Sequence, residues 1–262
     1  MYTRRSPRAA VLRPFVDSLE LVDDPPVHER ERIVPTAEVA IIFTLAEEGF
    51  AFFDPVERRA SAATVVGPAS SSQVVSTQAQ RGMLAVNFRR GGAVPFLRGP
   101  LSDAADTFVP LADHWAGEAS RLRERLLACP DDTERFDLVE RALMAAMVDP
   151  VIDRGIRAAI TALERGDRVA DVVETFGTTP KPFIKRFTRA VGLTPKRYAR
   201  VRRIQRVLHG LPPTDEIDWA ALAVEHGFYD QSHLTHDFTE ITGGSPAGHL
   251  SRSTGGINHV VC

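Results

Sequence analysis

Cysteine and long apolar runs are both scarce in this chain of 262 residues. Its two cysteines, Cys129 and Cys262, cannot build a disulfide framework, and their spacing is not that of a metal site. No apolar run approaches the ~20 residues that a membrane-spanning helix needs. The N-terminal stretch MYTRRSPRAAVLRPF has arginines but neither a long apolar core nor a small-residue cleavage site. We therefore expect no signal peptide and no membrane anchor, and a cytoplasmic protein.

Acidic residues are missing from one long segment. Between Thr175 and Pro213 the sequence holds ten lysines and arginines and no aspartate or glutamate. The net charge of the whole chain is only -2, so this segment is locally cationic within a nearly neutral protein. A solvated helix face is the simple alternative, but such a face is usually diluted by opposite charges. The pattern favours a polyanionic partner such as double-stranded DNA.

The front half is typical of strands, because short runs rich in Val, Ile, Phe and Thr alternate with Gly, Pro and Ser. Their spacing predicts an antiparallel sandwich or barrel. Histidine is represented there only by His28 and His114, so we expect no metal site. The strands are expected at residues 37–46, 51–54, 62–67, 72–78 and 83–88.

Beyond Pro110 the apolar residues recur at helical spacing. Residues 114–128 and 134–148 form two predicted helices, with Asp131 and Asp132 as candidate N-caps of the second. These helices could pack on the sheet, pair with a second subunit, or do both. Their apolar stripes are Leu122, Leu126 and Leu127, then Phe136, Val139, Leu143 and Met147. Further helices are expected at 153–165, 169–176, 180–191, 195–209, 218–226 and 231–242, with a short turn from Pro246.

The back half contains an internal repeat. Shifted by 51 residues, segment 169–195 overlays segment 220–246, so that Phe183 meets Leu234 and Phe187 meets Phe238. Each copy reads as a short helix, a turn near a glycine and a second helix. Thr179, followed by a proline, and Asp230 are the predicted N-caps of the two second helices. This is the pattern of a duplicated helix-turn-helix, whose second helix enters the major groove.

The stretch GFYDQSHLTHDF, residues 227–238, also allows other interpretations. His233 and His236 could share a helical face and bind a metal together with Asp237 or His226. The first copy has Pro182 and Lys185 where His233 and His236 stand, and neither is a ligand. A hydrolytic triad around Ser232 lacks an oxyanion hole. We therefore expect no metal, no cofactor and no enzyme activity.

One segment, AVEHGFYDQSHLTHDFTEITGGSP, fits the pattern A-x-x-x-G-F-x-D-x-S-H-[FL]-x-x-x-F-x4-G-x2-P, and KPFIKRFTRAVGLTPKRYARVRRIQRVL lies upstream. Over residues 151–250 the chain resembles the DNA-binding domain of AraC/XylS-type transcriptional regulators. Residues 87–126 are similar to a less characterised sensor domain that is fused to some of them. The resemblance implies a cupin-like β-barrel in front, often with dimerising helices, and two helix-turn-helix units behind.

The expected fold is therefore α+β with two domains. Residues 1–110 form an antiparallel, cupin-like β-barrel sensor domain, and residues 111–150 form a helical connector with candidate dimerisation helices. Residues 151–252 form the all-α domain with its two helix-turn-helix units, and residues 253–262 are a tail.

The two recognition helices differ in charge. In the second, His236 stands where the family usually has arginine, and Asp230, Asp237 and Glu240 leave the helix acidic. We expect the first helix to dominate binding. The base-facing candidates are Thr179, Lys181, Lys185, Gln231, Ser232, His233, Thr235 and His236. The phosphate candidates are Arg186, Arg189, Lys196, Arg197, Arg200 and Arg203.

The predicted function is sequence-specific, DNA-binding regulation of transcription, controlled by a small-molecule effector in the front barrel. Two alternatives stay open: a front half that only dimerises or binds another protein, and, remotely, a barrel enzyme with a DNA-binding tail. A homodimer and contact with RNA polymerase are expected as further partners, and no membrane. The candidate effector-pocket residues are Phe43, Phe52, Phe53 and Phe88.

Overall fold

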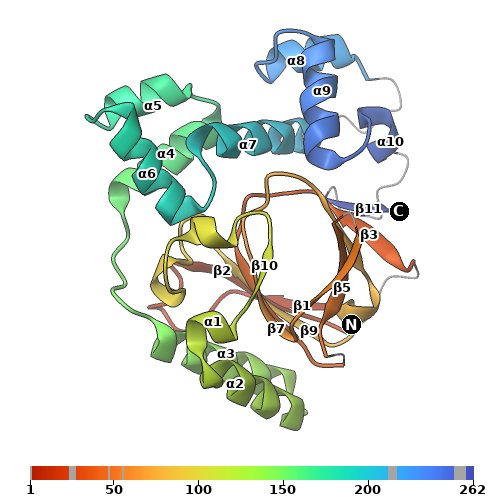
Figure 1. Ribbon diagram of the computed structural model, residues 1–262, viewed down its shortest axis with the longest axis vertical. Coiled ribbons are helices and arrows are strands. Elements are labelled where there is room, and N and C mark those ends of the chain that lie inside the picture. The colour runs from red at the N-terminus through yellow and green to blue at the C-terminus, as the bar shows by residue number, and fades with distance from the viewer. Residues whose placement is uncertain (1, 24–27, 47, 55, 212–216, 251–257) are drawn as a thin grey trace.

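The computed structural model of the chain (Figure 1) describes residues 2–23, 28–46, 48–54, 56–211, 217–250 and 258–262. A sheet-rich N-terminal part is followed by helices, and the C-terminal part is helical. The antiparallel front and the all-α back that the sequence predicts are thus confirmed. No helix among these residues is long and apolar enough to cross a membrane.

The strands form two antiparallel sheets. One has six strands in the order β1-β2-β9-β4-β7-β10, and the other has five in the order β11-β3-β8-β5-β6. Rings of Phe50 and Phe52 pack on Phe108 and so join the two sheets. The strands are Tyr2–Arg5 (β1), Val16–Val22 (β2), Arg30–Ile33 (β3), Ala40–Thr44 (β4), Phe50–Asp54 (β5), Val56–Ala60 (β6), Ala63–Val66 (β7), Gln73–Ser76 (β8), Met83–Phe88 (β9), Phe108–Pro110 (β10) and His259–Val261 (β11).

All five predicted strands are present, as β4, β5, β7, β8 and β9. Several others escaped the sequence pattern because their residues are charged or exposed. β3 reads RERI and β6 reads VERRA, and four of the five β6 residues are exposed. Such strands are recognised by their backbone partners, which apolar alternation does not reveal.

The helices after the sheets complete the N-terminal core. They are Ala112–Trp115 (α1), Gly117–Ala128 (α2) and Asp132–Ala146 (α3). Leu122, Leu126, Phe136, Val139 and Leu143 are buried against sheet residues, so packing on the sheet is confirmed for both long helices. The exception within the predicted stripes is Leu127, which is exposed. Asp131 caps α3 by accepting a hydrogen bond from the Glu134 N–H at 2.7 Å.

The C-terminal helices coincide closely with the prediction. α7 runs through both units: Tyr198 and Val201 lie in the core of the first, and Ile204, Val207 and Leu208 lie in the core of the second. The helices are Arg154–Arg165 (α4), Val169–Thr175 (α5), Pro180–Val191 (α6), Pro195–His209 (α7), Trp219–Glu225 (α8), Gln231–Thr242 (α9) and Pro246–Leu250 (α10).

One loop of the N-terminal domain touches both helix-turn-helix units. Residues 67–72 join β7 to β8 and meet the glycine that ends each recognition helix. Gly192 has φ +89°, and a Cβ there would lie 2.3 Å from Cγ of Pro68. Gly243 has φ +73°, and its Cβ would lie 2.7 Å from the Ser72 hydroxyl. Both positions therefore need glycine for conformation and for close approach.

The chain end is a structural element and not only a tail. β11 pairs with β3 of the second sheet, and Val260 is buried in the core of the second helix-turn-helix unit together with Val34. From α7, Gln205 donates hydrogen bonds to the carbonyl of Pro35 and to the side chain of Asn258. The prediction of a tail is wrong for residues 259–261, and residues 253–257 lie outside the described ranges.

Candidate nucleic-acid interface

The first unit positions its outward side chains through two buried phenylalanines. Phe183 and Phe187 of α6 are fully buried in a core shared with α4, α5 and α7. Lys181 and Lys185, on the opposite face, are exposed. Thr179 is exposed too, and its side chain makes no capping hydrogen bond, contrary to the prediction. The base-facing candidates of this unit are thus all open to solvent.

The second unit repeats this construction in α9. Leu234 and Phe238 are fully buried. The N-cap Asp230 accepts a hydrogen bond from the His233 N–H at 2.7 Å, as predicted, and so satisfies an amide of the first turn. Thr235 is half-buried, and the other candidates of this helix are exposed: Gln231, Ser232, His233 and His236.

The two recognition helices lie at opposite ends of α7 (Figure 1). α7 has 15 residues, which at ~1.5 Å per residue makes it roughly 22 Å long. Its apolar residues are shared between the cores of both units, so the helix holds the units apart as a rigid spacer. One helix therefore separates two helix-turn-helix units, as expected of a protein whose two recognition helices contact the same duplex.

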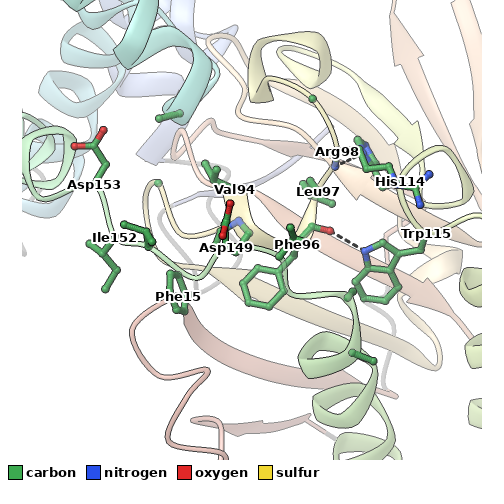
Figure 2. A pocket seen from close by; sticks show the side chains of 18 of the residues that line it. Phe15, Val94, Phe96, Leu97, Arg98, His114, Trp115, Asp149, Ile152 and Asp153 are labelled. Carbon is green, nitrogen blue, oxygen red and sulfur yellow. Dashed lines mark hydrogen bonds between the residues drawn. The ribbon is translucent and has the colours of Figure 1, made fainter.

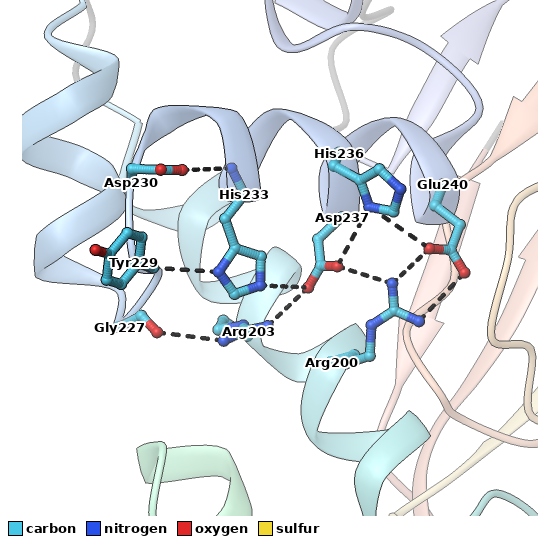
Figure 3. A network of polar contacts seen from close by, with 9 residues as sticks. All are labelled: Arg200, Arg203, Gly227, Tyr229, Asp230, His233, His236, Asp237 and Glu240. Carbon is cyan, nitrogen blue, oxygen red and sulfur yellow. Dashed lines mark hydrogen bonds and ion pairs between the residues drawn. The ribbon is translucent and has the colours of Figure 1, made fainter.

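Two predicted phosphate contacts, Arg200 and Arg203 of α7, turn toward α9 (Figure 3). Arg200 donates to Asp237 at 2.8 Å and to Glu240 at 2.6 Å. Arg203 donates to the other carboxylate oxygen of Asp237 at 2.7 Å and to the carbonyl of Gly227 at 3.2 Å. The structure therefore gives both guanidinium groups a role inside the protein, because their charges already face carboxylates.

Asp237 is the buried centre of this network, with only 6% of its side chain exposed. Burial by itself raises the pKa of this carboxyl, but hydrogen bonds from Arg200 and Arg203 outweigh burial and hold the pKa below its usual value. His233 and His236 lie 3.9 Å from the same carboxylate. Asp237 is thus ionised near neutral pH and fastens α9 to α7.

Sequence reasoning treated Asp237 as an acidic surface group and missed this role. Helix spacing held a signal, because Asp237 follows Leu234 by three residues and directly precedes Phe238, both core residues. It therefore lies on the flank of the buried face. Arg200 and Arg203 are three residues apart, a spacing that puts both guanidinium groups on one side of α7.

Two more phosphate candidates are engaged within the chain. Arg186 binds Asp153 through two hydrogen bonds of 2.8 Å, and that carboxylate also caps α4. Arg197 lies 3.6 Å from Asp106. Within the described ranges no carboxylate oxygen lies within 4.0 Å of the charged groups of the remaining cations on this side: Lys181, Lys185, Arg189 and Lys196.

A metal site would have to use donors that are already occupied. Atoms of His236, Asp237 and Glu240 lie within 4.8 Å of one another. Arg200 donates to both of these carboxylates, so a metal ion would have to displace its guanidinium group. His226, the other candidate ligand, lies outside this group.

The four predicted effector residues do not line the cavity of about 960 Å³ that the structure contains beside α4 and α6. Phe43 and Phe88 are fully buried in the N-terminal core. Phe52 packs on the Phe108 ring, and Phe53 lies under the guanidinium of Arg30 at 4.0 Å. Phe53 also lines a smaller hollow of about 230 Å³, together with Phe50 and Arg30. A role of these four residues in binding an effector stays a prediction.

A cavity of about 960 Å³ lies instead between the N-terminal domain and the first helix-turn-helix unit (Figure 2). Trp115 forms part of its wall, and the indole N–H donates to the carbonyl of Phe96 at 2.8 Å. His114 accepts from the Arg98 N–H at 3.1 Å, and burial lowers the pKa of the imidazole. α4 contributes Ile156 and Ile160 to the lining, and α6 contributes Arg186, Arg189 and Ala190.

Comparisons with known proteins agree with this architecture. A family profile described as "Helix-turn-helix domain" matches residues 172–252, and one described as "Domain of unknown function (DUF6597)" matches residues 4–110. A search of the curated proteins gives no match.

Solved structures of ToxT from Vibrio cholerae are similar over nearly the whole chain. The fatty acid-bound wild-type ToxT is 13% identical, covering 96% of this chain and 99% of that one, with a TM-score of 0.47. A 1.65 Å structure of ToxT is 9% identical, covering 96% and 97%, with a TM-score of 0.41. The helix-turn-helix match falls on the duplicated unit of α5–α6 and α8–α9. The C-terminal part is therefore an AraC-type helix-turn-helix domain, and the chain is a DNA-binding transcriptional regulator.

Proposed function

We propose that this regulator reads its DNA site mainly through α6, with α9 as a weaker second contact. One observation carries the proposal: the lysines on the outer face of α6 are free, whereas the arginines beside α9 are paired. Lys181 and Lys185 have no carboxylate within 4.0 Å among the described residues, but Arg200 and Arg203 are held by Asp237. Free lysines can neutralise phosphates or meet guanine edges in the major groove.

The contacts that we propose follow from the position of each side chain. Lys185, near the middle of the exposed face of α6, is placed to donate to guanine O6 or N7, and Lys181 and Thr179 lie at the N-terminal end of the helix. On α9, Gln231 suits adenine. Ser232, His233, Thr235 and His236 are the further base-facing candidates of that helix.

The surroundings of α9 weaken its contact with DNA. Glu240 is 53% exposed and Asp230 is exposed as well, so both stand near the path of the backbone phosphates. Like charges repel, and the two arginines of α7 that could offset these carboxylates are held by Asp237. Phosphate contacts are left mainly to Arg189, near the end of α6, and Lys196, at the start of α7, which are both exposed.

We further propose that a small-molecule effector controls DNA binding through the N-terminal domain. Loop 67–72 and β11 attach that domain to both helix-turn-helix units, so a ligand that prefers one arrangement of the domains would change the geometry of both recognition helices.

The experiment that tests the DNA contacts is hydroxyl-radical footprinting on a duplex selected from a random pool by the full-length protein. We expect strong protection around one major groove and weaker protection around the next. Lys185→Ala should remove the strong part and leave the footprint of α9 nearly as faint as before. Glu174→Gln, an exposed change on α5, is the control. Equal protection of both grooves in the wild-type protein would contradict the proposal.

A role in self-association is a second candidate for the N-terminal part. Met144, Val148 and Val151 lie at the end of α3 and just beyond it, and their exposed fractions are 38%, 70% and 77%. Apolar side chains clustered in this way favour a protein contact. Sedimentation velocity of wild-type protein and of Val148→Lys/Val151→Lys tests this: a dimer that dissociates in the variant supports it, and a wild-type monomer at all concentrations refutes it.

A further inference from the structure

His236 of α9 occupies the position that Lys185 occupies in α6. The shift of 51 residues that overlays the two helix-turn-helix units places one residue on the other, and both side chains are exposed. Lysine stays charged near neutral pH, whereas an imidazole ordinarily takes up its proton between about pH 5 and 8. The two recognition helices therefore carry different groups at the same place, a permanent cation in α6 and a proton-dependent one in α9.

The charged groups around His236 balance one another. Its Nδ1 atom lies 3.9 Å from an oxygen of Asp237 and 3.9 Å from an oxygen of Glu240, both on α9 (Figure 3). From α7, the guanidinium groups of Arg200 and Arg203 bind these carboxylates. Two negative and two positive charges cancel, so this group offers no net positive charge to a phosphate while His236 is neutral.

Both carboxylates stay ionised in the pH range where an imidazole titrates. Burial raises the pKa of Asp237, but hydrogen bonds from Arg200 and Arg203 outweigh burial and keep the pKa below its usual value. For Glu240, the hydrogen bond from Arg200 is the main cause of a lowered pKa. A proton that this group takes up between pH 8 and pH 6 therefore goes to the imidazole and leaves one positive charge in excess. Whichever cation then faces the carboxylates, another becomes available to DNA.

His233 lies on the same helix but is less suited to this role. Its Nδ1 atom accepts a hydrogen bond from the Tyr229 N–H at 3.3 Å, and its ring packs edge-on against Phe228. A second proton on the ring would remove the lone pair that this hydrogen bond uses. Within the described ranges no hydrogen bond occupies the ring of His236, whose side chain is 77% exposed.

The first recognition helix contains no residue that titrates between pH 6 and pH 8. It reads PKPFIKRFTRAV, without histidine and without a carboxylate. Its lysines and arginines keep their charge throughout this range. A change of pH therefore acts on α9 and leaves the charge of α6 constant, so the α6 contact is an internal reference for the α9 contact.

We propose that α9 is a proton-dependent DNA contact, which gains one phosphate contact when His236 is protonated. At pH 8 the protein binds mainly through α6, and at pH 6 it holds two successive major grooves. The inference rests on the proposed function, in which α6 is the main contact and α9 the weaker one. It adds that the weakness of α9 is set by pH.

The salt dependence of binding counts the phosphate contacts and so tests the proposal. Each phosphate that a cation neutralises adds about 0.9 to the slope of log K against the logarithm of the salt concentration. The slope is measured by fluorescence anisotropy with the full-length protein and a selected duplex, at pH 6 and at pH 8. We expect a slope steeper by about 0.9 at pH 6, and an affinity about fivefold to tenfold higher at about 0.1 M salt. An identical slope at the two pH values would overturn the proposal.

Substitutions of single histidines assign the effect. His236→Gln is neutral at both pH values and should show the shallower slope at both. His236→Arg is charged at both pH values and should show the steeper slope at both. His233→Gln removes the neighbouring imidazole and should keep the difference between pH 6 and pH 8. A difference that persists in His236→Gln, or that disappears in His233→Gln, would overturn the assignment to His236.

Hydroxyl-radical footprints at the two pH values separate this inference from the proposed function. We expect equal protection of the α6 groove at pH 8 and pH 6, and stronger protection of the α9 groove at pH 6. One strong and one weak groove that did not change with pH would overturn the proton-dependent contact and leave the proposed function standing. Equal protection of both grooves at pH 8 would refute the proposed function, while the salt slopes of the variants would still decide the role of His236.

Discussion

Replacing Asp237 by asparagine should release the second recognition helix from α7. The substitution keeps the side-chain shape, removes the charge between Arg200 and Arg203, and leaves two guanidinium groups without their buried partner. Breaking a buried ion pair of this kind costs roughly 3–5 kcal/mol. Here the arginine side chains are 28% and 22% exposed, so water recovers part of the loss. We therefore expect a local destabilisation of about 2–4 kcal/mol.

Hydrogen exchange measured by mass spectrometry on residues 231–242 is the direct assay. A loss of ~2–4 kcal/mol corresponds to roughly 30- to 1,000-fold faster exchange of the α9 amides. Glu240→Gln is the matched control, because that side chain is 53% exposed and contacts Arg200 but not Arg203, so its effect should stay below about 1 kcal/mol. Exchange in Asp237→Asn no faster than in Glu240→Gln would refute the role of the buried carboxylate.

The same comparison has a defined pH dependence. The pKa of Asp237 is lowered in the folded protein from its usual value of 3.8. A lowered pKa means that the stabilisation is fully present above the usual value and is lost as the pH falls through the lowered one. The difference between wild type and Asp237→Asn should therefore be constant near neutral pH and shrink below pH 3.8. A difference that grew on acidification would contradict this sign.

Three further predictions concern other parts of the molecule. Lys185→Ala should weaken specific DNA binding by ~1–3 kcal/mol in a titration against the selected duplex, and an unchanged affinity would remove this residue from the interface. Gly192→Ala should lower the thermal midpoint more than Gly177→Ala. Both glycines have positive φ, but only at position 192 would the added Cβ clash with Pro68. Equal decreases in the thermal midpoint would show that this contact is unimportant. Val260→Asp puts a charge into a buried core and should make the C-terminus susceptible to limited proteolysis, whereas an unchanged cleavage pattern would argue against docking of β11.

The helices of the DNA-binding domain were predictable because their boundaries are encoded locally. α6, α7 and α9 begin and end at the predicted residues. A proline at the first helical position starts α6 and α7, and glycines in the left-handed conformation end α6 and α9. The internal repeat also identified the core residues Phe183 and Leu234 correctly.

The pairing of charges and the site of the cavity were not predictable in this way, because they depend on segments far apart in the sequence. Asp237 meets arginines more than thirty residues away, and Arg186 meets Asp153 across a similar separation. The four phenylalanines predicted to line an effector pocket lie in strands, but the cavity is lined mainly by helices, a linker and a loop. The strand β11 could not be recognised either, since three residues show no alternation without their partner β3.

The central claim is that α6 supplies most of the DNA affinity because its lysines are free. It is tested most directly by measuring the affinity of one selected duplex for two double variants, Lys181→Ala/Lys185→Ala in α6 and Gln231→Ala/His236→Ala in α9. The account predicts a loss of about a hundredfold or more for the α6 variant and less than about tenfold for the α9 variant. A larger loss for the α9 variant would contradict it.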